Sequence, residues 1–309
     1  MGSMSSGMRA CLLVIAASLG LGGCAGLERL AIPKMHLDSA WSPAAPQSRL
    51  RIDHGPWDAF LATYVHSDAD GVNRVAYGAV TPQDRARLNA YIAGLAKTPV
   101  SRLTRNQQLA FWVNLYNALT VNLVLDHYPI KSIRKIKPHL FSVGPWGIAL
   151  VRVEDREITL YHIENQILRP IWKDPRIHYL LNCAAVGCPN LGRRAVTAEN
   201  AESVMEAAAR AYINNPRGLT FDAKGRLILS KIYLWYREDF DRDGGVLAHL
   251  RKYANADLRR RLAGKPRIHR YRYDWALNDA GARLSRADQT PNITPGVGLW
   301  PNSSPVPGP

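Results

Sequence analysis

One long helix near the middle of the chain constrains the fold more than any other feature of the sequence. Thr104 and Gln107 have the spacing of a capping box, in which each side chain bonds the backbone of the other residue. This signal predicts a helix over residues 105–126 that stops near Pro129. Its large apolar residues recur at helical spacing, so we expect them in the core: Trp112, Leu115, Tyr116 and Leu119.

Shorter helices and strands are predicted on both sides of this helix. The helical segments are residues 57–64, 82–95, 161–169, 198–213, 233–240, 246–253 and 258–262. The strands are residues 72–80, 148–153 paired with 157–160, 176–182, 219–222 paired with 226–229, and 267–273. This mixture indicates an α+β fold, with a small, mostly antiparallel sheet packed with helices.

The N-terminus has the pattern of a lipoprotein signal. Leu12–Leu21 form an apolar run that is shorter than the roughly 20 residues a membrane span requires. Arg9 precedes the run, and Gly22 and Gly23 lead directly to Cys24, which predicts a secretory signal with Cys24 as lipid acceptor. Plain secretion is an alternative, and the first six residues also fit a loose myristoylation pattern.

This signal and the composition divide the chain into four parts. We expect a cleaved signal peptide over residues 1–23, a tether rich in Ala, Pro and Ser over 24–50, one globular domain over 51–284, and a disordered tail over 285–309. Cys11 leaves with the signal and Cys24 is acylated. Only Cys183 and Cys188 then remain as thiols of the mature protein.

The chain is strongly basic, with 40 Lys and Arg against 25 Asp and Glu, and a net charge of +15. Such a charge favours anionic partners, among them lipid head groups and lipopolysaccharide. An exported protein seldom meets nucleic acid, so we expect no nucleic-acid partner. A generally arginine-rich composition would explain the charge equally well.

The sequence LAFWVNLYNAL at Leu109–Leu119 resembles the domain-of-unknown-function family 547 (DUF547). Further segments carry the same resemblance, which extends from about residue 56 to 275: residues 125–129 with Ser132 and Ile133, 163–169, 174–189 and 233–240. The resemblance implies a fold related to the papain-like or transglutaminase-like cysteine hydrolases, in proteins of bacterial envelopes. The family name itself assigns no activity.

His178 and Cys183 are the candidate base and nucleophile of such a hydrolase. A thiol needs a neighbouring imidazole or helix N-terminus to ionise near neutral pH, and Glu164 could orient the imidazole. Residues five apart on a strand point to opposite faces, so the segment must bend before Cys183 for the two groups to meet. Alternatively, His178 is a core histidine and Glu164 forms a salt bridge with Arg169.

The two cysteines have other possible roles. They could form a small-loop disulfide, stay as inert buried thiols, or bind a metal, although with His178 and His162 they match no known zinc spacing. Cys183 is the better nucleophile because Cys188 precedes the rigid Pro189. We expect no metal and no other cofactor.

Polar residues near the candidate site have supporting roles. Members of the family carry Ile-Glu-His where this chain has Ile163-Glu164-Asn165, so an essential family histidine would be absent here or replaced by His162. Buried amides need hydrogen-bond partners. Asn114 and Asn117 on the long helix therefore either clamp the loop around Asn182 and Cys183 or donate to an oxyanion.

Two functions follow from these observations. The leading one is a lipid-anchored cysteine hydrolase or acyltransferase that acts on a peptide or amide of the envelope. The alternative is a non-enzymatic envelope module that binds or has a structural role, with Cys183 and Cys188 joined or inert.

The lipid anchor is tested by Cys24→Ser. Two acyl chains give stable membrane attachment, and a serine cannot carry them. We expect the variant to be released or mislocalised, and to leave the detergent phase in which the wild-type protein partitions. Unchanged partitioning would remove the lipid anchor from the account.

Overall fold

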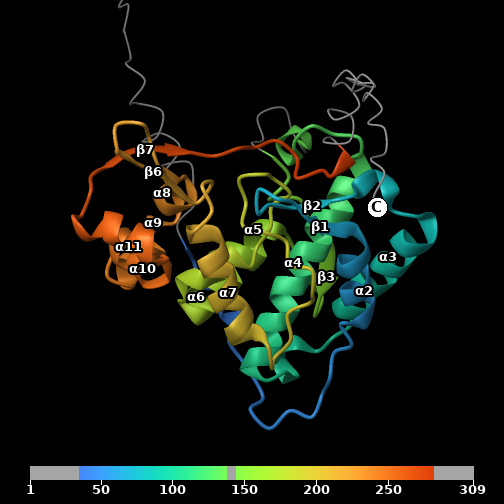
Figure 1. The fold of residues 1–309 in the computed structure, drawn as a ribbon. Helices are drawn as coiled ribbons and strands as arrows, with labels where there is room; N and C mark the ends of the chain where they lie inside the picture. Colours follow the sequence, from blue (N-terminus) through green and yellow to red (C-terminus); the bar gives the residue numbers. More distant parts are fainter. Residues whose placement is uncertain (1–34, 138–143, 282–309) are drawn as a thin grey trace, which may run out of the picture.

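The computed structural model describes residues 35–137 and 144–281 of the chain. Helix α4 (Arg105–His127) runs through the middle of the molecule, with other elements on both sides of it (Figure 1). Its predicted capping box is present, because Thr104 N donates to Gln107 Oε1 at 2.9 Å and Gln107 N donates to Thr104 Oγ1 at 3.3 Å. Every residue from Gln108 to Val121 is buried, so the whole circumference of the helix belongs to the core.

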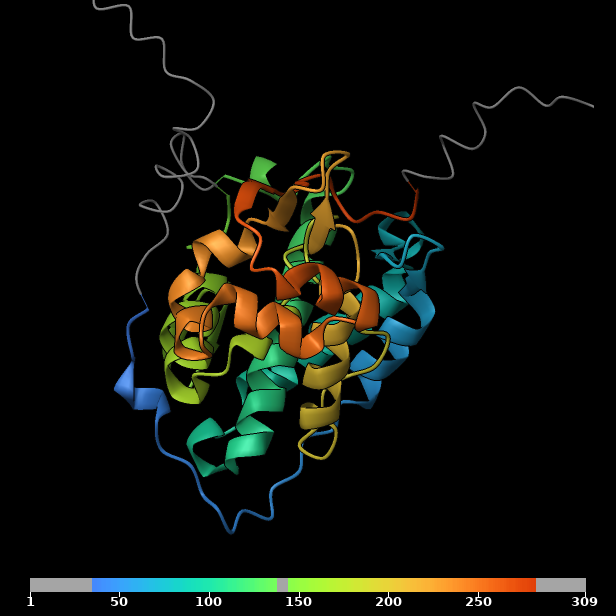
Figure 2. The same ribbon diagram turned by 60° about the vertical axis from the view of Figure 1, so that its left-hand side comes forward.

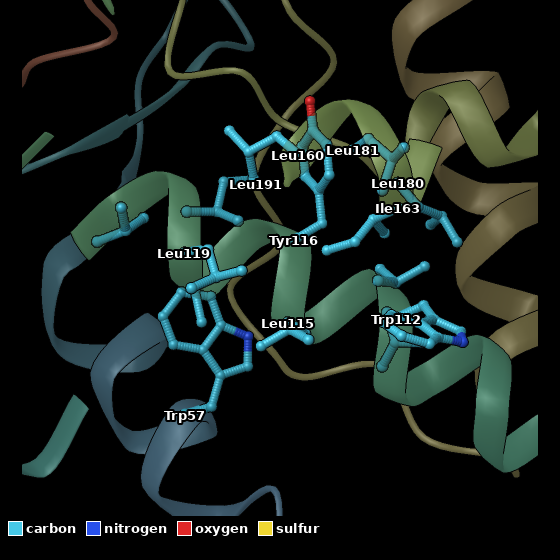
Figure 3. Packing of buried hydrophobic residues seen from close by; sticks show 14 of the residues in the cluster. Trp57, Trp112, Leu115, Tyr116, Leu119, Leu160, Ile163, Leu180, Leu181 and Leu191 are labelled. Carbon is cyan, nitrogen blue, oxygen red and sulfur yellow. The ribbon is translucent and has the colours of Figure 1, made fainter. Parts of the chain in front are cut away.

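The other helices cover α4 from both sides. On one side lie α2 (Gly55–Tyr64) and α3 (Pro82–Ala96), and on the other lie the helices around α6 and α7 (Figure 1). Figure 3 shows Trp57 of α2 and Ile163 packed on opposite sides of the apolar face of α4. Besides short 3-10 helices, the described residues form α5 (Leu160–His162), the π-helix η5 (Ile163–Leu168), α6 (Arg169–Trp172), α7 (Ala201–Ile213), α8 (Ile232–Trp235), α9 (Arg237–Arg242), α10 (Val246–Tyr253) and α11 (Ala256–Ala263).

In the part of the chain that the structure describes, the strands form three small sheets rather than the single sheet that we expected. Two are antiparallel hairpins, β1 (Val65–Ser67) with β2 (Asn73–Val75) and β3 (Val151–Val153) with β4 (Arg156–Ile158). In the third, β6 (Leu227–Ser230) pairs antiparallel with β5 (Leu219–Phe221) and parallel with β7 (Ile268–Arg272). The α+β class is confirmed.

Two apolar clusters share the interior. The larger one surrounds α4 and takes residues from Trp41 to Leu277. The smaller one is formed by α7–α11 and the third sheet, and the rings of Tyr179, Tyr212 and Phe240 are buried in it. Both clusters include buried residues of the 3-10 helix η6 (Pro175–Tyr179), which therefore lies between them.

Residues 176–182 were predicted as a strand, and this prediction is wrong. Asp174 instead caps η6, with its carboxylate accepting a hydrogen bond from Arg176 N at 2.8 Å. Pro175 follows at the first helical position, where its fixed φ favours a helical turn. The local cap thus outweighs the β-propensity of the apolar residues that follow.

Other boundaries also differ from the predictions. The predicted strand over 72–80 is limited to β2, and Tyr77–Ala79 form a 3-10 helix, η2. Helix 161–169 continues as α6 through Pro170, which fits the first turn of an α-helix. Helix α7 begins at Ala201 rather than at 198.

Residues 35–50 lie against the domain, although we expected them to belong to the tether. The indole of Trp41 is 2% exposed and packs edge-on against Trp112, with ring centroids 4.9 Å apart. His36 N donates to the carbonyl of Asn165 at 3.2 Å. The predicted signal peptide, Cys24 and the tail over 285–309 lie outside the described residues. No helix between residues 35 and 281, as far as these are described, has the length and apolarity to cross a membrane.

Two buried asparagines on α4 hold the backbone of distant segments. Asn117 Nδ2 donates to the carbonyl of Leu180 at 2.9 Å, and Asn117 Oδ1 accepts from Asn182 N at 2.9 Å. Asn114 bonds both backbone groups of Val196 in the same way, at 2.7 and 3.1 Å. Each side-chain amide thus donates one hydrogen bond to a backbone carbonyl and accepts one from a backbone N–H, as a backbone peptide group would. Asn117 therefore clamps the segment that leads to Cys183.

Asn117→Ala tests this clamp. The substitution leaves a buried carbonyl and a buried N–H without partners, each at a cost of about 1–3 kcal/mol. We expect the free energy of unfolding in urea to fall by about 2–4 kcal/mol. Asn122 on the same helix is a matched control, because its Oδ1 has no hydrogen-bond partner. Equal losses for Asn117→Ala and Asn122→Ala would contradict the clamp.

Candidate functional site

The two cysteines of the candidate site are joined. Cys183 and Cys188 form a disulfide that closes a short loop directly after Asn182. The hydroxyl of Tyr273, which follows β7, lies 3.2 Å from Cys183 Sγ and 3.0 Å from Cys188 Sγ. Cys188 is 1% exposed, whereas Cys183 is only half-buried. Cys183 is therefore the more accessible of the two sulfurs.

Backbone bonds and one glycine shape the cysteine loop. Asn182 Nδ2 donates to the carbonyl of Pro189 at 2.8 Å, across the base of the loop. Gly187 N donates to the carbonyl of Asp274 at 2.8 Å. A Cβ at Gly187 would lie 2.7 Å from the backbone nitrogen of Asp274, so only glycine permits this approach. The loop is thus fixed to α4 on one side and to the segment after β7 on the other.

A buried ion network lies on η5, η6 and α9. His178 Nε2 is 2.8 Å from Asp239 Oδ2, and Arg169 Nε donates to the same oxygen at 2.6 Å. Glu164 Oε1 lies 3.6 Å from His178 Nδ1. The imidazole also stacks on Tyr236, with ring centroids 4.1 Å apart. Acidic and basic side chains thus alternate along this buried network, in the order Glu164, His178, Asp239 and Arg169.

The network changes the pKa values of its members. Burial alone would lower the pKa of His178, but the carboxylates of Asp239 and Glu164 outweigh it and raise that pKa. Burial opposes ionisation of Asp239, yet the hydrogen bonds and charges of His178 and Arg169 lower its pKa to about 2. The pair is therefore an imidazolium and a carboxylate over the middle of the pH range.

Glu164 also faces buried phenol groups. Burial raises the pKa of Tyr116 and of Tyr236 well above the usual range, and the Glu164 carboxylate raises both further. Burial, together with neighbouring groups that include Glu164, also raises the pKa of Tyr273 well above the usual range. These hydroxyls stay protonated and can donate hydrogen bonds. The charge of Glu164 thus acts both on His178 and on the tyrosine that touches the disulfide.

Asn165, at which the family resemblance led us to expect a histidine, serves the same network. Its Oδ1 accepts from Arg169 Nη1 at 2.7 Å. His162 does not take the place of that histidine, because its Nε2 lies 2.9 Å from Asp38 Oδ2, on the N-terminal segment. The alternative salt bridge from Glu164 to Arg169 is not formed, since Arg169 pairs with Asp239 and Glu238.

The structure brings together only part of the predicted triad. Glu164 and His178 face each other, but within the described ranges no hydrogen bond or ring contact joins His178 to Cys183. Asp239 and Tyr273 were not among the predicted site residues, although Asp239 lies in residues 233–240, one of the segments that carry the family resemblance. Across residues 35–137 and 144–281, no group of three or more His, Cys, Asp or Glu could hold a metal ion.

Asp239→Asn tests the network. It leaves the charge of Arg169 buried with one partner fewer, and loss of one member of a buried pair costs about 3–5 kcal/mol. The raised pKa of His178 means that its pairing stabilises the fold below its ordinary pKa of 6.5 and is lost as the pH rises through the raised value. The lowered pKa of Asp239 means that its contribution is present above 3.8 and is lost as the pH falls towards about 2.

We therefore expect denaturant unfolding to show the largest stability deficit of Asp239→Asn between pH 3.8 and 6.5, with a smaller deficit in alkaline solution. Asp241→Asn on the same helix is the control, because Asp241 forms a half-exposed pair with Arg237 at 3.4 Å and should cost less than about 1 kcal/mol. A deficit that is the same at every pH would exclude the proposed pairing of His178 with Asp239.

Comparison with known proteins gives one match. Residues 100–213 match the family described as "Protein of unknown function, DUF547", which confirms the resemblance over this segment. The matched segment contains α4, Glu164, His178 and both cysteines of the loop. Asp239 and Tyr273 lie beyond its end. No curated protein and no solved structure matches the chain.

Proposed function

We propose that this chain, whose residues 100–213 belong to the DUF547 family, is an envelope lipoprotein whose folded domain acts as a non-enzymatic binding module. The observation that carries the proposal is the disulfide between Cys183 and Cys188. A thiolate, and not a disulfide sulfur, is the nucleophile of a cysteine hydrolase.

The environment of His178 supports the same conclusion. A general base must lie within hydrogen-bond reach of the group that it deprotonates. His178 is 4% exposed, and its Nε2 is already paired with Asp239. A ring placed between these two carboxylates stabilises the fold, and it is not placed to take a proton from the Cys183 sulfur.

The proposed location rests on the sequence of the N-terminus. Cys24 would carry the lipid, and Ala25 in place of aspartate after it favours the outer membrane of a Gram-negative cell, with the domain facing the periplasm. The lipid would attach the chain to the membrane, and anionic components of the envelope are the proposed partners.

A cysteine hydrolase or acyltransferase, active after reduction of the disulfide, is the second candidate. One observation favours it: Cys183 is half-buried and lies beside the hydroxyl of Tyr273. That hydroxyl could donate a hydrogen bond to a thiolate once Cys188 is released.

Alkylation separates the two candidates. The chain is purified without reductant, treated with iodoacetamide, and mapped by peptide mass spectrometry. We expect Cys183 and Cys188 to stay unlabelled until a dithiol reduces them, because a disulfide is not alkylated. In Cys188→Ser, the released Cys183 should react no faster than a free cysteine near pH 7, since no imidazole of the described residues contacts it.

Two results would favour the hydrolase instead. One is rapid labelling of Cys183 in the unreduced protein. The other is accelerated labelling of Cys183 in Cys188→Ser that disappears when His178→Ala is added, whereas His66→Ala, which removes an exposed imidazole on β1, does not remove it.

A further inference from the structure

The C-terminal end of the domain carries a dense group of exposed cations. Helix α11 and strand β7, with the turn between them, hold seven Lys and Arg residues and one acidic residue, Asp257. All seven side chains are exposed. We call this surface the basic strip: Arg259, Arg260, Arg261, Lys265, Arg267, Arg270 and Arg272. Figure 2 turns this end of the molecule, coloured orange to red, towards the viewer.

The charges of the basic strip are largely uncompensated. Arg260 pairs with Asp257 at 3.2 Å, but both side chains are well exposed, so the pair is weak. Lys265, Arg267 and Arg270 form no ion pair within the described part of the chain. Elsewhere in the domain, arginines such as Arg176 are held by carboxylates on both sides. The strip thus differs from such paired arginines and brings several unpaired cations together on neighbouring elements.

The elements beneath the strip are firmly attached. Leu262 is fully buried and fixes α11 to the smaller apolar cluster. Strand β7 pairs with β6 on one side and is the last strand of its sheet. The cations are spread along a helix of eight residues and a strand of five rather than converging on one point. Such an arrangement fits an extended anionic surface better than a single phosphate group.

The described chain begins close to this end of the domain. Met35 Sδ lies 3.7 Å from Arg242 Nη2 on α9, and α9 packs in the same apolar cluster as α10 and α11. Cys24 lies eleven residues before Met35 in the sequence. Even a fully extended chain of that length spans at most about 40 Å. An anchor at Cys24 would thus hold the domain near a bilayer from the end that carries the strip.

We propose that the basic strip is a docking surface for an anionic phospholipid bilayer. Phosphate head groups would supply the counter-charges that residues 35–137 and 144–281 do not provide, and docking would orient the domain on its membrane. The proposed envelope location only determines which membrane the strip meets, and the strip can be tested without the lipid anchor.

The test uses the full chain with Cys24→Ser, which cannot be acylated, in sedimentation with vesicles of phosphatidylcholine alone or with phosphatidylglycerol. We expect binding only to the anionic vesicles, with an affinity that falls as the salt concentration rises from 0.01 M to 0.15 M and the screening length shortens from about 30 Å to about 8 Å. Arg260→Gln, Arg267→Gln and Arg270→Gln together should weaken binding about 100-fold, since each basic residue near an anionic surface contributes about 1 kcal/mol.

The control variant removes the same charge elsewhere, through Arg49→Gln, Lys97→Gln and Arg102→Gln, which are also exposed. It should bind nearly as tightly as the parent chain. The apolar N-terminal run is common to all three chains, so differences report the cations alone. Equal losses for both triple variants would mean that only net charge matters and would overturn the proposal.

Two further results would also overturn it. Absence of binding to anionic vesicles would leave the strip as protection of the exposed edge of β7, a role that charged residues commonly have. Tighter binding to an oligonucleotide than to the vesicles would assign the strip to a nucleic-acid partner. Failure of the lipid anchor in a cell would contradict the proposed location but would leave these vesicle results unchanged.

Discussion

The complete burial of α4 is the constraint on which the rest of the domain depends. A helix surrounded by the core must satisfy the polar side chains at its centre inside the protein. Asn114 and Asn117 do so by binding the backbone of Val196 and of the segment from Leu180 to Asn182. The position of the cysteine loop is therefore a consequence of how α4 is buried.

A second constraint joins the two halves of the interior. Asp239 of α9 binds both His178 of η6 and Arg169 at the start of α6, so one carboxylate links three elements. Glu164 faces His178 from the π-helix, a form of helix that is frequent at functional sites. The residue types are those of a hydrolase centre, but His178 Nε2 and Arg169 Nε are both bonded to Asp239 within the network. The types of residue at this place therefore suggest catalysis, whereas the contacts between them favour a structural ion network.

Features with local causes could be predicted from the sequence. The capping box at Thr104, the hairpin β5–β6 and helix α10 all follow from signals within a few residues, and the α+β class follows from their sum. The turn at Asp174 was missed because its cap competes with a strongly apolar run. Asp239 and Tyr273 act across 61 and 90 residues of sequence, beyond what spacing can indicate. Whether the two sulfurs are bonded depends on the distance between them in the folded chain, so the sequence alone does not determine it.

The account makes His178 a member of an ion pair and not the base of a thiol, and this is open to direct measurement. Side-chain nitrogen NMR of His178 reports the protonation of both ring nitrogens. We predict a ring that is mostly imidazolium at pH 6.5, the ordinary pKa of a histidine, and whose signals stay unchanged when Cys183→Ser and Cys188→Ser remove the disulfide. A ring that is mostly neutral at pH 6.5, with signals that move when Cys183 is replaced, would contradict the ion pair.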